Sequence, residues 1–201
     1  MKMVKRAREI LNVEIKELQR VRQCLGLEFS RSVKLILEGL NRNGKIVVAG
    51  VGKCFHVGQK ISATLSSTGS PSVTLHPSQA LHGDIGILGG NDILLALSHS
   101  GESAEILEIL PAVKRLGAKV VAMTGAPASA LARSSDAFIL IPVRREACPF
   151  NLAPTASTTA MLAVGDALAI VLLEARGFRK EDFAKLHPGG AIGRTLLLRV
   201  A

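Results

Sequence analysis

Apolar residues recur at helical spacing through the first part of the chain. Within residues 2–25, a stripe of apolar positions is surrounded by Lys, Arg and Glu, the stripe being Ala7, Leu11, Leu18, Val21 and Leu25. This spacing predicts an amphipathic helix. A second helix is expected to begin near Phe29 and to stop at the turn-forming run Asn41-Arg42-Asn43-Gly44.

From Lys45 onward the pattern changes to short, continuous apolar runs that alternate with helical segments. The runs predicted as strands are Ile46–Ala49, Val73–Leu75, Ile93–Leu97, Lys119–Met123 and Phe138–Pro142. The predicted helices are Phe55–Ser67, Ser103–Leu116, Thr155–Arg176 and Lys180–Lys185. A strand that is buried on both faces has no reason to alternate, so these runs predict a parallel sheet covered by helices on both sides.

The fold class is therefore expected to be α/β, with a doubly wound, flavodoxin-like parallel sheet of about five strands flanked by helices. No internal repeat or break in composition divides the chain. We expect a single domain over residues 1–201, with N-terminal helices in 1–44 and the α/β core in 45–201. The N-terminal helices are expected to pack on the flank of the sheet or against another subunit.

Composition narrows the range of partners. The 201 residues are 48% apolar, enough for one sizeable core, and the net charge of +9 lies mostly in the first 45 residues. Trp and Tyr are absent, which removes the stacking platforms of single-strand binders, and we expect no nucleic-acid partner. No apolar run approaches the roughly 18 residues of a membrane span. With its three scattered cysteines, the chain is expected to be cytoplasmic, with reduced thiols and no membrane contact.

Ligands of such sheets bind at the carboxyl ends of the strands, so the loops there should carry the chemistry. The run Ser98-His99-Ser100-Gly101-Glu102-Ser103 follows one predicted strand and opens a helix. Its hydroxyls and free backbone N–H groups, at the positive end of a helix dipole, favour a phosphate site. An ordinary serine-rich helix cap is the plainer alternative.

The loop Gly50-Val51-Gly52-Lys53 carries glycines but fits neither nucleotide pattern. The third glycine of the dinucleotide fingerprint would fall at Phe55, and Cys54 stands where the ATP-binding pattern has a hydroxyl residue. What remains is a bend that brings Lys53 to the edge of the sheet. There it is either an anion contact or a solvated surface charge.

Histidines and carboxylates in other loops have both reactive and ordinary interpretations. His76 and His82 are as well explained by packed imidazoles as by reactive ones, and their neighbours do not have the spacing of a catalytic zinc site. Glu105 either faces the serine loop or simply favours the helix dipole. Glu146 lies in a basic loop that is otherwise a surface loop, and His187 starts a run that also fits a helix stop.

Several segments, in their order along the chain, match one known pattern. They include Gly50-Val51-Gly52-Lys53, Ser67-Thr68-Gly69, His82-Gly83-Asp84, the serine loop through Glu105, Glu146-Ala147-Cys148-Pro149 and His187-Pro188-Gly189-Gly190-Ala191. Together they resemble the sugar isomerase (SIS) domain of arabinose-5-phosphate isomerases, over nearly all of residues 45–200. Many relatives continue into CBS modules where this sequence stops. The chain is thus expected to be a lone SIS domain without CBS modules, or a piece of a longer protein.

The resemblance implies an activity. It is the reversible conversion of D-ribulose 5-phosphate into D-arabinose 5-phosphate through an enediolate, which feeds synthesis of the acid Kdo of lipopolysaccharide or capsule. No organic cofactor is required. Two alternatives stay open: a non-catalytic SIS module that senses a sugar phosphate, and an isomerase of another phosphorylated sugar.

The resemblance also implies a set of site residues. Its catalytic members are Lys53, Glu105, Glu146 and His187, with His82 in the same pocket. Its substrate- and phosphate-binding members are Gly52, Gly69, Ser70, His76, Ser98, Ser100 and Ser103. His76 is also expected to take up an inhibitory zinc ion.

Roles within this set are expected as follows. Glu146 is the carbon base, Glu105 assists proton transfer between oxygens, Lys53 balances the charge of the enediolate, and a histidine opens cyclic substrate. SIS enzymes usually complete each site with a neighbouring chain. A homotetramer with shared active sites is therefore expected, with His187 supplied by another subunit and the N-terminal helices at the interface.

Overall fold

The computed structural model describes residues 1–187. The expected motif at 188–191 and the chain end at 198–201, where CBS modules would begin, lie outside the described residues. Of the motif that runs from 187 to 191, only His187 is described.

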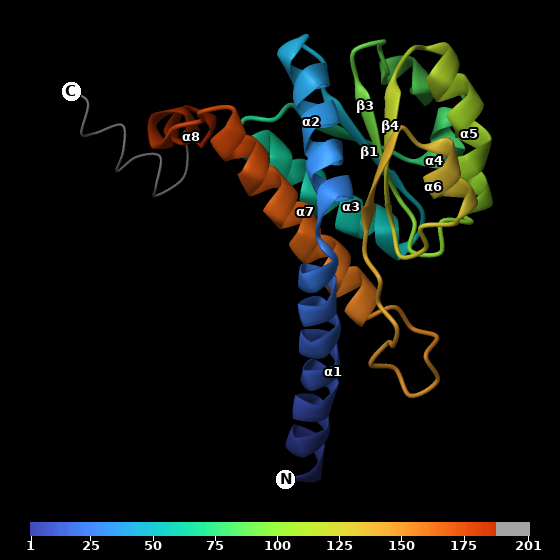
Figure 1. Cartoon of the computed structure of the whole chain (residues 1–201), viewed down its shortest axis with the longest axis vertical. Coiled ribbons are helices and arrows are strands. Elements are labelled where there is room, and N and C mark those ends of the chain that lie inside the picture. The colour runs from blue at the N-terminus through green and yellow to red at the C-terminus, as the bar shows by residue number, and fades with distance from the viewer. Residues whose placement is uncertain (188–201) are drawn as a thin grey trace.

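Two helices precede the sheet, as the apolar spacing predicts. Helix α1 covers Lys2–Cys24 and α2 covers Leu27–Asn41. Only the second half of α1 packs against the body, and its buried residues are Glu17 and Val21. The first half extends past the rest of the molecule (Figure 1), so apolar side chains there stay exposed, namely Met3, Val4 and Leu11.

The sheet has five parallel strands in the order β2-β1-β3-β4-β5, which confirms the predicted doubly wound fold. The strands are β1 Ile46–Gly50, β2 Ser72–Leu75, β3 Ile93–Leu97, β4 Lys119–Thr124 and β5 Ala137–Leu140. Residues of β1 and β3 are buried throughout, as their unbroken apolar runs require. The last strand ends two residues before Pro142, which has no N–H to donate to a neighbouring strand.

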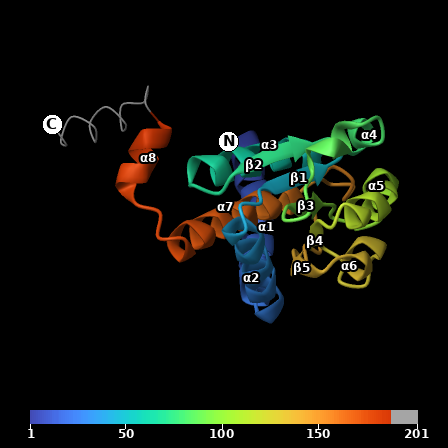
Figure 2. The same cartoon turned by 90° about the horizontal axis from the view of Figure 1, so that it is seen from above.

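Helices cover both faces of the sheet (Figure 2). One face packs against α1, α2, α3 (Lys53–Ser67) and α7 (Ala156–Ala175), and its core includes Ile36, Ile61 and Leu168. The other face packs against α4 (Pro77–Ala80), α5 (Ala104–Arg115) and α6 (Ala130–Ser134), with Ile109 in its core. The last described helix, α8, covers Lys180–Leu186 and lies beyond the C-terminal end of α7.

Three short elements were not expected from the sequence. They are α4, α6 and a single 3-10 turn, η1, at Asp84–Ile87. Each has four or five residues, too few for an apolar period to show. Local caps start two of them instead: His76 accepts a hydrogen bond from the Ser78 N–H, and Ser129 accepts one from the Ala132 N–H.

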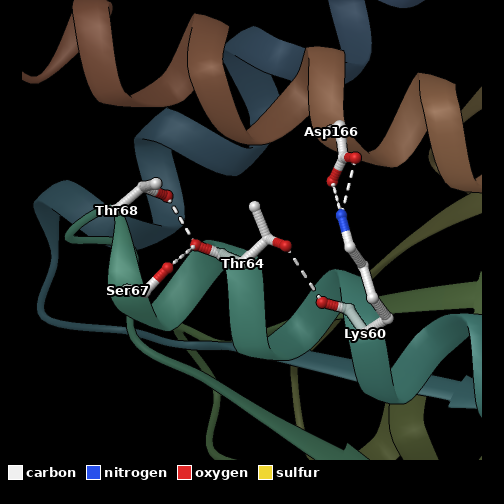
Figure 3. A network of polar contacts seen from close by, with 5 residues as sticks. All are labelled: Lys60, Thr64, Ser67, Thr68 and Asp166. Carbon is white, nitrogen blue, oxygen red and sulfur yellow. Dashed lines mark hydrogen bonds and ion pairs between the residues drawn. The ribbon is translucent and has the colours of Figure 1, made fainter. Parts of the chain in front are cut away.

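Helices α3 and α7 are joined by an ion pair (Figure 3). Lys60 of α3 holds the carboxylate of Asp166 of α7, with Nζ at 2.6 Å from Oδ2. Thr64 donates its hydroxyl to the Lys60 carbonyl at 3.1 Å, one turn along α3. By length and composition α7 could cross a membrane, but half of its apolar window is buried inside the protein. It is a helix of the core, in which Leu168 and Leu172 are fully buried.

Asp92 ties together two loops at the amino end of the sheet. Its carboxylate accepts hydrogen bonds from the Lys45 N–H (2.8 Å), the Gly89 N–H (2.7 Å) and the Lys45 ammonium (2.6 Å). Burial raises the pKa of the carboxyl, but the bonds from Lys45 and Gly89 outweigh burial and hold the pKa below its usual value. The ionised form therefore stabilises the fold.

Replacing Asp92 with Ala is expected to lower the free energy of unfolding by about 3 kcal/mol at neutral pH, because two backbone N–H groups lose their acceptor. The contribution is complete above the unfolded-state pKa of about 3.9 and is lost as pH falls through the lower folded-state pKa. Urea unfolding at pH 7 and pH 3 measures both effects. The exposed Glu108→Ala is the control, and an Asp92→Ala protein as stable as wild type at pH 7 would contradict the prediction.

Candidate active site

A cavity of about 390 Å³ opens at the carboxyl ends of the strands. Its walls come from the loops after β1, β3 and β5 and from the first turns of α7; they include Lys53, Cys54, His99, Arg144, Glu146 and Ser157. The helices that follow β1 and β3 cover opposite faces of the sheet, so the crevice between them is where such folds bind ligands.

Lys53 reaches this cavity from the first turn of α3. Gly52 is the N-cap of that helix, and Lys53 is its first residue. The side chain is exposed and lines the cavity. A mobile ammonium at this position can balance negative charge on a bound molecule.

Glu146 is held in the cavity wall by the N-terminus of α7. Its Oε2 accepts hydrogen bonds from the Thr155 N–H (2.8 Å), the Thr155 hydroxyl (3.0 Å) and the Ser157 N–H (3.2 Å). Burial raises the pKa of this carboxyl, but the bonds from Ser157 and Thr155 outweigh burial, and the pKa lies below its usual value. Glu146 is therefore ionised at neutral pH, the form that a base needs.

The serine loop folds around the buried Ser98. Its Oγ lies 2.8 Å from the Ser103 Oγ and accepts a hydrogen bond from the Gly101 N–H at 3.1 Å. Gly101 has φ of +68°, and a Cβ at that position would clash with the Ser129 hydroxyl, so only glycine fits. Ser98, Ser100 and Ser103 thus gather at the start of α5, although His99 is the residue of this loop that lines the cavity. Phosphate binding by the three serines stays a prediction.

His99 is a cavity residue that the sequence reasoning did not single out. Its ring lines the cavity with Lys53 and Glu146, and its buried Nδ1 has no hydrogen-bond partner within the described residues. Burial lowers the pKa of the imidazole, against the opposing effect of the Glu146 charge. The sequence signal is its place directly after the strand and Ser98, but the hydroxyls around it accounted for the loop without it.

Glu105, His76 and His82 lie at the carboxyl side of the sheet but outside the cavity wall. Glu105 is exposed on the first turn of α5, and His82 is exposed in the turn between α4 and η1. His76 caps α4 and packs its ring edge-on against Phe55, with centroids 5.0 Å apart. The cavity of a single chain does not include these three side chains.

Gly69 and Ser70 lie at the opposite end of the sheet, and His187 ends α8, which lies beyond the C-terminal end of α7. Gly69 and Ser70 follow α3 and precede β2, and the Phe178 ring covers Gly69. His187 stacks on Phe183 at the end of α8 (centroids 3.9 Å apart). Helix α7, about 30 Å long at 1.5 Å per residue, separates this end from the cavity. None of the three is among the residues that line the cavity.

His76, the expected zinc ligand, has few other potential metal ligands near it. Over residues 1–187, no group of three or more His, Cys, Asp or Glu side chains is placed to hold a metal ion. The His76 Nδ1 accepts a hydrogen bond from the Ser78 N–H at 3.3 Å, which leaves Nε2 as the nitrogen available to an ion. This arrangement does not fit a resident metal centre.

Helix α1 anchors the loop that carries Glu146. The buried Glu17 of α1 accepts a hydrogen bond from the Arg144 N–H at 3.0 Å and one from the Arg20 guanidinium at 3.1 Å. Nearby, the Thr159 hydroxyl of α7 donates to Glu14 at 3.2 Å. Helix α1 therefore holds in place the segment at Arg144, which lines the cavity just before Glu146.

Replacing Glu17 with Ala is expected to lower the free energy of unfolding by about 2 kcal/mol, because the Arg144 N–H loses its acceptor in a partly buried hydrogen bond. Hydrogen exchange at that amide should accelerate at least tenfold, whereas Glu17→Gln, which keeps an acceptor oxygen, should retain most of the protection. Exchange mass spectrometry of the 143–150 peptide measures this. Glu9→Ala, in an exposed pair with Arg6, is the control, and unchanged exchange in Glu17→Ala would contradict the anchoring role.

Comparison with known protein families matches residues 39–171 to the SIS domain, a span from the end of α2 into α7. The chain belongs to the SIS domain family. Among curated relatives of this SIS domain, the arabinose 5-phosphate isomerase KdsD of Pseudomonas aeruginosa is 54% identical over 176 residues (88% of this chain, 53% of the relative). KdsD of Salmonella typhi is 47% identical over 194 residues (96% and 58%). This SIS domain thus spans about half the length of these relatives.

Among solved structures, protein c3406 of E. coli CFT073, in complex with arabinose 5-phosphate, superposes on this SIS domain with a TM-score of 0.89 at 37% identity. The alignment covers 93% of this chain and 98% of that one. The predicted SIS fold is therefore confirmed over nearly the whole length of a solved relative.

Proposed function

We propose that this SIS domain interconverts D-ribulose 5-phosphate and D-arabinose 5-phosphate through an enediolate. The observation that carries the proposal is the cavity in which an ionised Glu146 and Lys53 lie with His99 of the serine loop. Relatives at 54% and 47% identity are named arabinose 5-phosphate isomerases, and a solved relative binds arabinose 5-phosphate. Such a product would feed synthesis of Kdo for lipopolysaccharide or capsule.

The reaction moves one proton between neighbouring carbons and another between their oxygens. Glu146 takes the carbon-bound proton, since its carboxylate is ionised and fixed by α7. Lys53 balances the negative charge that develops on the enediolate oxygens. The serine loop binds the phosphate, so that binding energy far from the reacting carbons holds them in place.

The remaining residues of the expected set act from outside the wall of one chain's cavity. Glu105 assists the transfer between oxygens, and His82 or His187 opens cyclic substrate. Because His187, Gly69 and Ser70 lie away from their own chain's cavity, they act on a neighbouring subunit's substrate. The proposal therefore includes a homotetramer with shared sites.

Exposed apolar residues on α1 support such an assembly, as does a cavity of about 310 Å³ between α1 and α7 lined by Ile15, Leu18 and Val164. Light scattering should give a mass about four times 21.2 kDa. Mixing subunits of an inactive Glu146→Gln protein with subunits of an inactive His187→Ala protein should restore part of the activity. A monomer of full activity would exclude shared sites.

The reaction consumes no electron acceptor, so the proposal includes no organic cofactor. Zinc inhibition through His76 and a cytoplasmic location are part of the same proposal. Addition of zinc to the assay, with a His76→Ala variant as control, tests the inhibition, and cell fractionation tests the location.

Incubation of the purified protein with ribulose 5-phosphate tests the activity, with identification of any aldose phosphate formed. In heavy water, turnover should also place solvent deuterium on C2 of the aldose phosphate, the carbon to which a proton returns after Glu146 has removed one from the neighbouring C1 of the ketose. A module that only senses a sugar phosphate would bind without exchange. If the protein converted a hexose or heptose phosphate in preference to the pentose phosphate, the proposed substrate would be wrong, and the proposed class of reaction would stand.

A further inference from the structure

The orientation of the His99 ring is fixed by its neighbours. A Cβ built on Gly125 would lie 2.5 Å from the His99 Cε1 and 2.7 Å from Nδ1, so this edge of the ring lies directly against the Gly125 backbone. The backbone around it is also held, since the Gly125 N–H and the Thr124 hydroxyl both donate to the His99 carbonyl, at 2.9 and 3.3 Å. The ring can present only its other edge, which carries Nε2, to the cavity.

The same contacts determine which nitrogen carries the proton. Burial favours the neutral imidazole, which has one N–H and one lone pair. Nδ1 is fully buried and has no partner among the described residues. A buried N–H without an acceptor is among the least tolerated groups in proteins. The proton therefore belongs on Nε2, at the cavity.

We propose that His99 is a further catalytic residue, a neutral imidazole whose Nε2–H donates a hydrogen bond to the sugar oxygen that becomes negative in the enediolate. The inference rests on the proposed isomerase activity. A neutral donor that is fixed before the substrate binds stabilises charge that appears only in the transition state. No full proton transfer from His99 is needed, since the hydrogen stays on Nε2.

The position of His99 suits this task. It follows Ser98 of the serine loop, so a sugar phosphate held by that loop passes close to the ring. Glu146 and Lys53 line the same cavity. The base, the balancing cation and the donor thus surround one small volume, which an enediolate of two or three carbons would occupy.

Two substitutions at His99 separate donation from packing. His99→Phe fills the space beside Gly125 without a donor and should lower kcat about 100-fold or more, with KM changed less than about threefold. His99→Gln extends an amide N–H to about the position of Nε2 and should stay within about tenfold of wild type. His56→Gln, an exposed histidine on α3, is the matched control and should leave kcat unchanged.

Nitrogen-15 NMR of labelled protein tests the tautomer without any activity. The His99 signals, assigned by their loss in His99→Gln, should show a protonated Nε2 and an unprotonated Nδ1. A proton on Nδ1 would overturn the proposal, as would a His99→Phe enzyme with wild-type kcat or with a defect in KM alone. If wild type does not convert ribulose 5-phosphate, the proposed function fails instead, and the NMR result still decides the tautomer.

Discussion

Replacing Glu146 with Gln should abolish measurable turnover of ribulose 5-phosphate, with a loss in kcat of at least about 1,000-fold, in the upper part of the range for general acid–base catalysis. Gln has the shape of Glu but cannot take a proton from carbon. The loss should appear in kcat more than in KM, because the phosphate contacts are elsewhere. Coupled detection of the aldose phosphate and deuterium incorporation from heavy water measure the same step independently.

The fold should survive this change. The substituted glutamine side chain would keep a carbonyl oxygen to accept the bonds that Thr155 and Ser157 now donate to Glu146. The free energy of unfolding should fall by about 1 kcal/mol, because a neutral amide interacts less well than a carboxylate with the N-terminus of α7. Glu174→Gln, exposed at the other end of the same helix, is the control. Turnover within tenfold of wild type in Glu146→Gln would remove Glu146 from the role of base.

Most of the fold could be predicted from the sequence, because its main elements are long and strongly patterned. The strand Ile93–Leu97 is apolar at every position and is completely buried, and α7 shows its apolar character over 20 residues. The short helices α4 and α6 have no such pattern. Their positions depend on single caps, such as the Ser129 hydroxyl, which look the same in the sequence as ordinary turns.

The cavity was predictable in part, and topology explains which part. Lys53, Glu146 and the serine loop each follow a strand, and the carboxyl ends of parallel strands lie at one edge. Gly69 precedes a strand, so the same rule places it at the other edge, and the family resemblance alone had put it beside the substrate. His187 comes after α7, which runs back from the cavity, and after α8, so it too lies away from the cavity.

The role of His99 could not be predicted from the sequence, for a different reason. Its chemistry depends on a backbone approach by Gly125, which follows the neighbouring strand 26 residues later in the chain. Nothing in the local sequence indicates that contact. The tautomer, and with it the direction in which the ring donates, is a property of packing between two strands.

The double variant Ser100→Ala/Ser103→Ala should lower kcat/KM for ribulose 5-phosphate by about 100-fold or more, mainly through KM. Each hydroxyl that bonds a phosphate oxygen contributes about 1.5–3 kcal/mol, as hydrogen bonds to charged groups do. Ser98 is left in place because its Oγ holds the Gly101 N–H, and its loss would deform the loop itself. Ser66→Ala, an exposed serine at the far end of α3, should have no effect on either constant.

Ribulose without its phosphate makes this prediction specific. Its conversion should be far slower than that of the phosphate ester in wild type, because it lacks the anchoring interactions. The double variant should leave that slow rate nearly unchanged, since the missing hydroxyls had no phosphate to hold. If kcat/KM of the double variant fell equally for both substrates, the serines would support only the general shape of the cavity. Another group would then have to bind the phosphate.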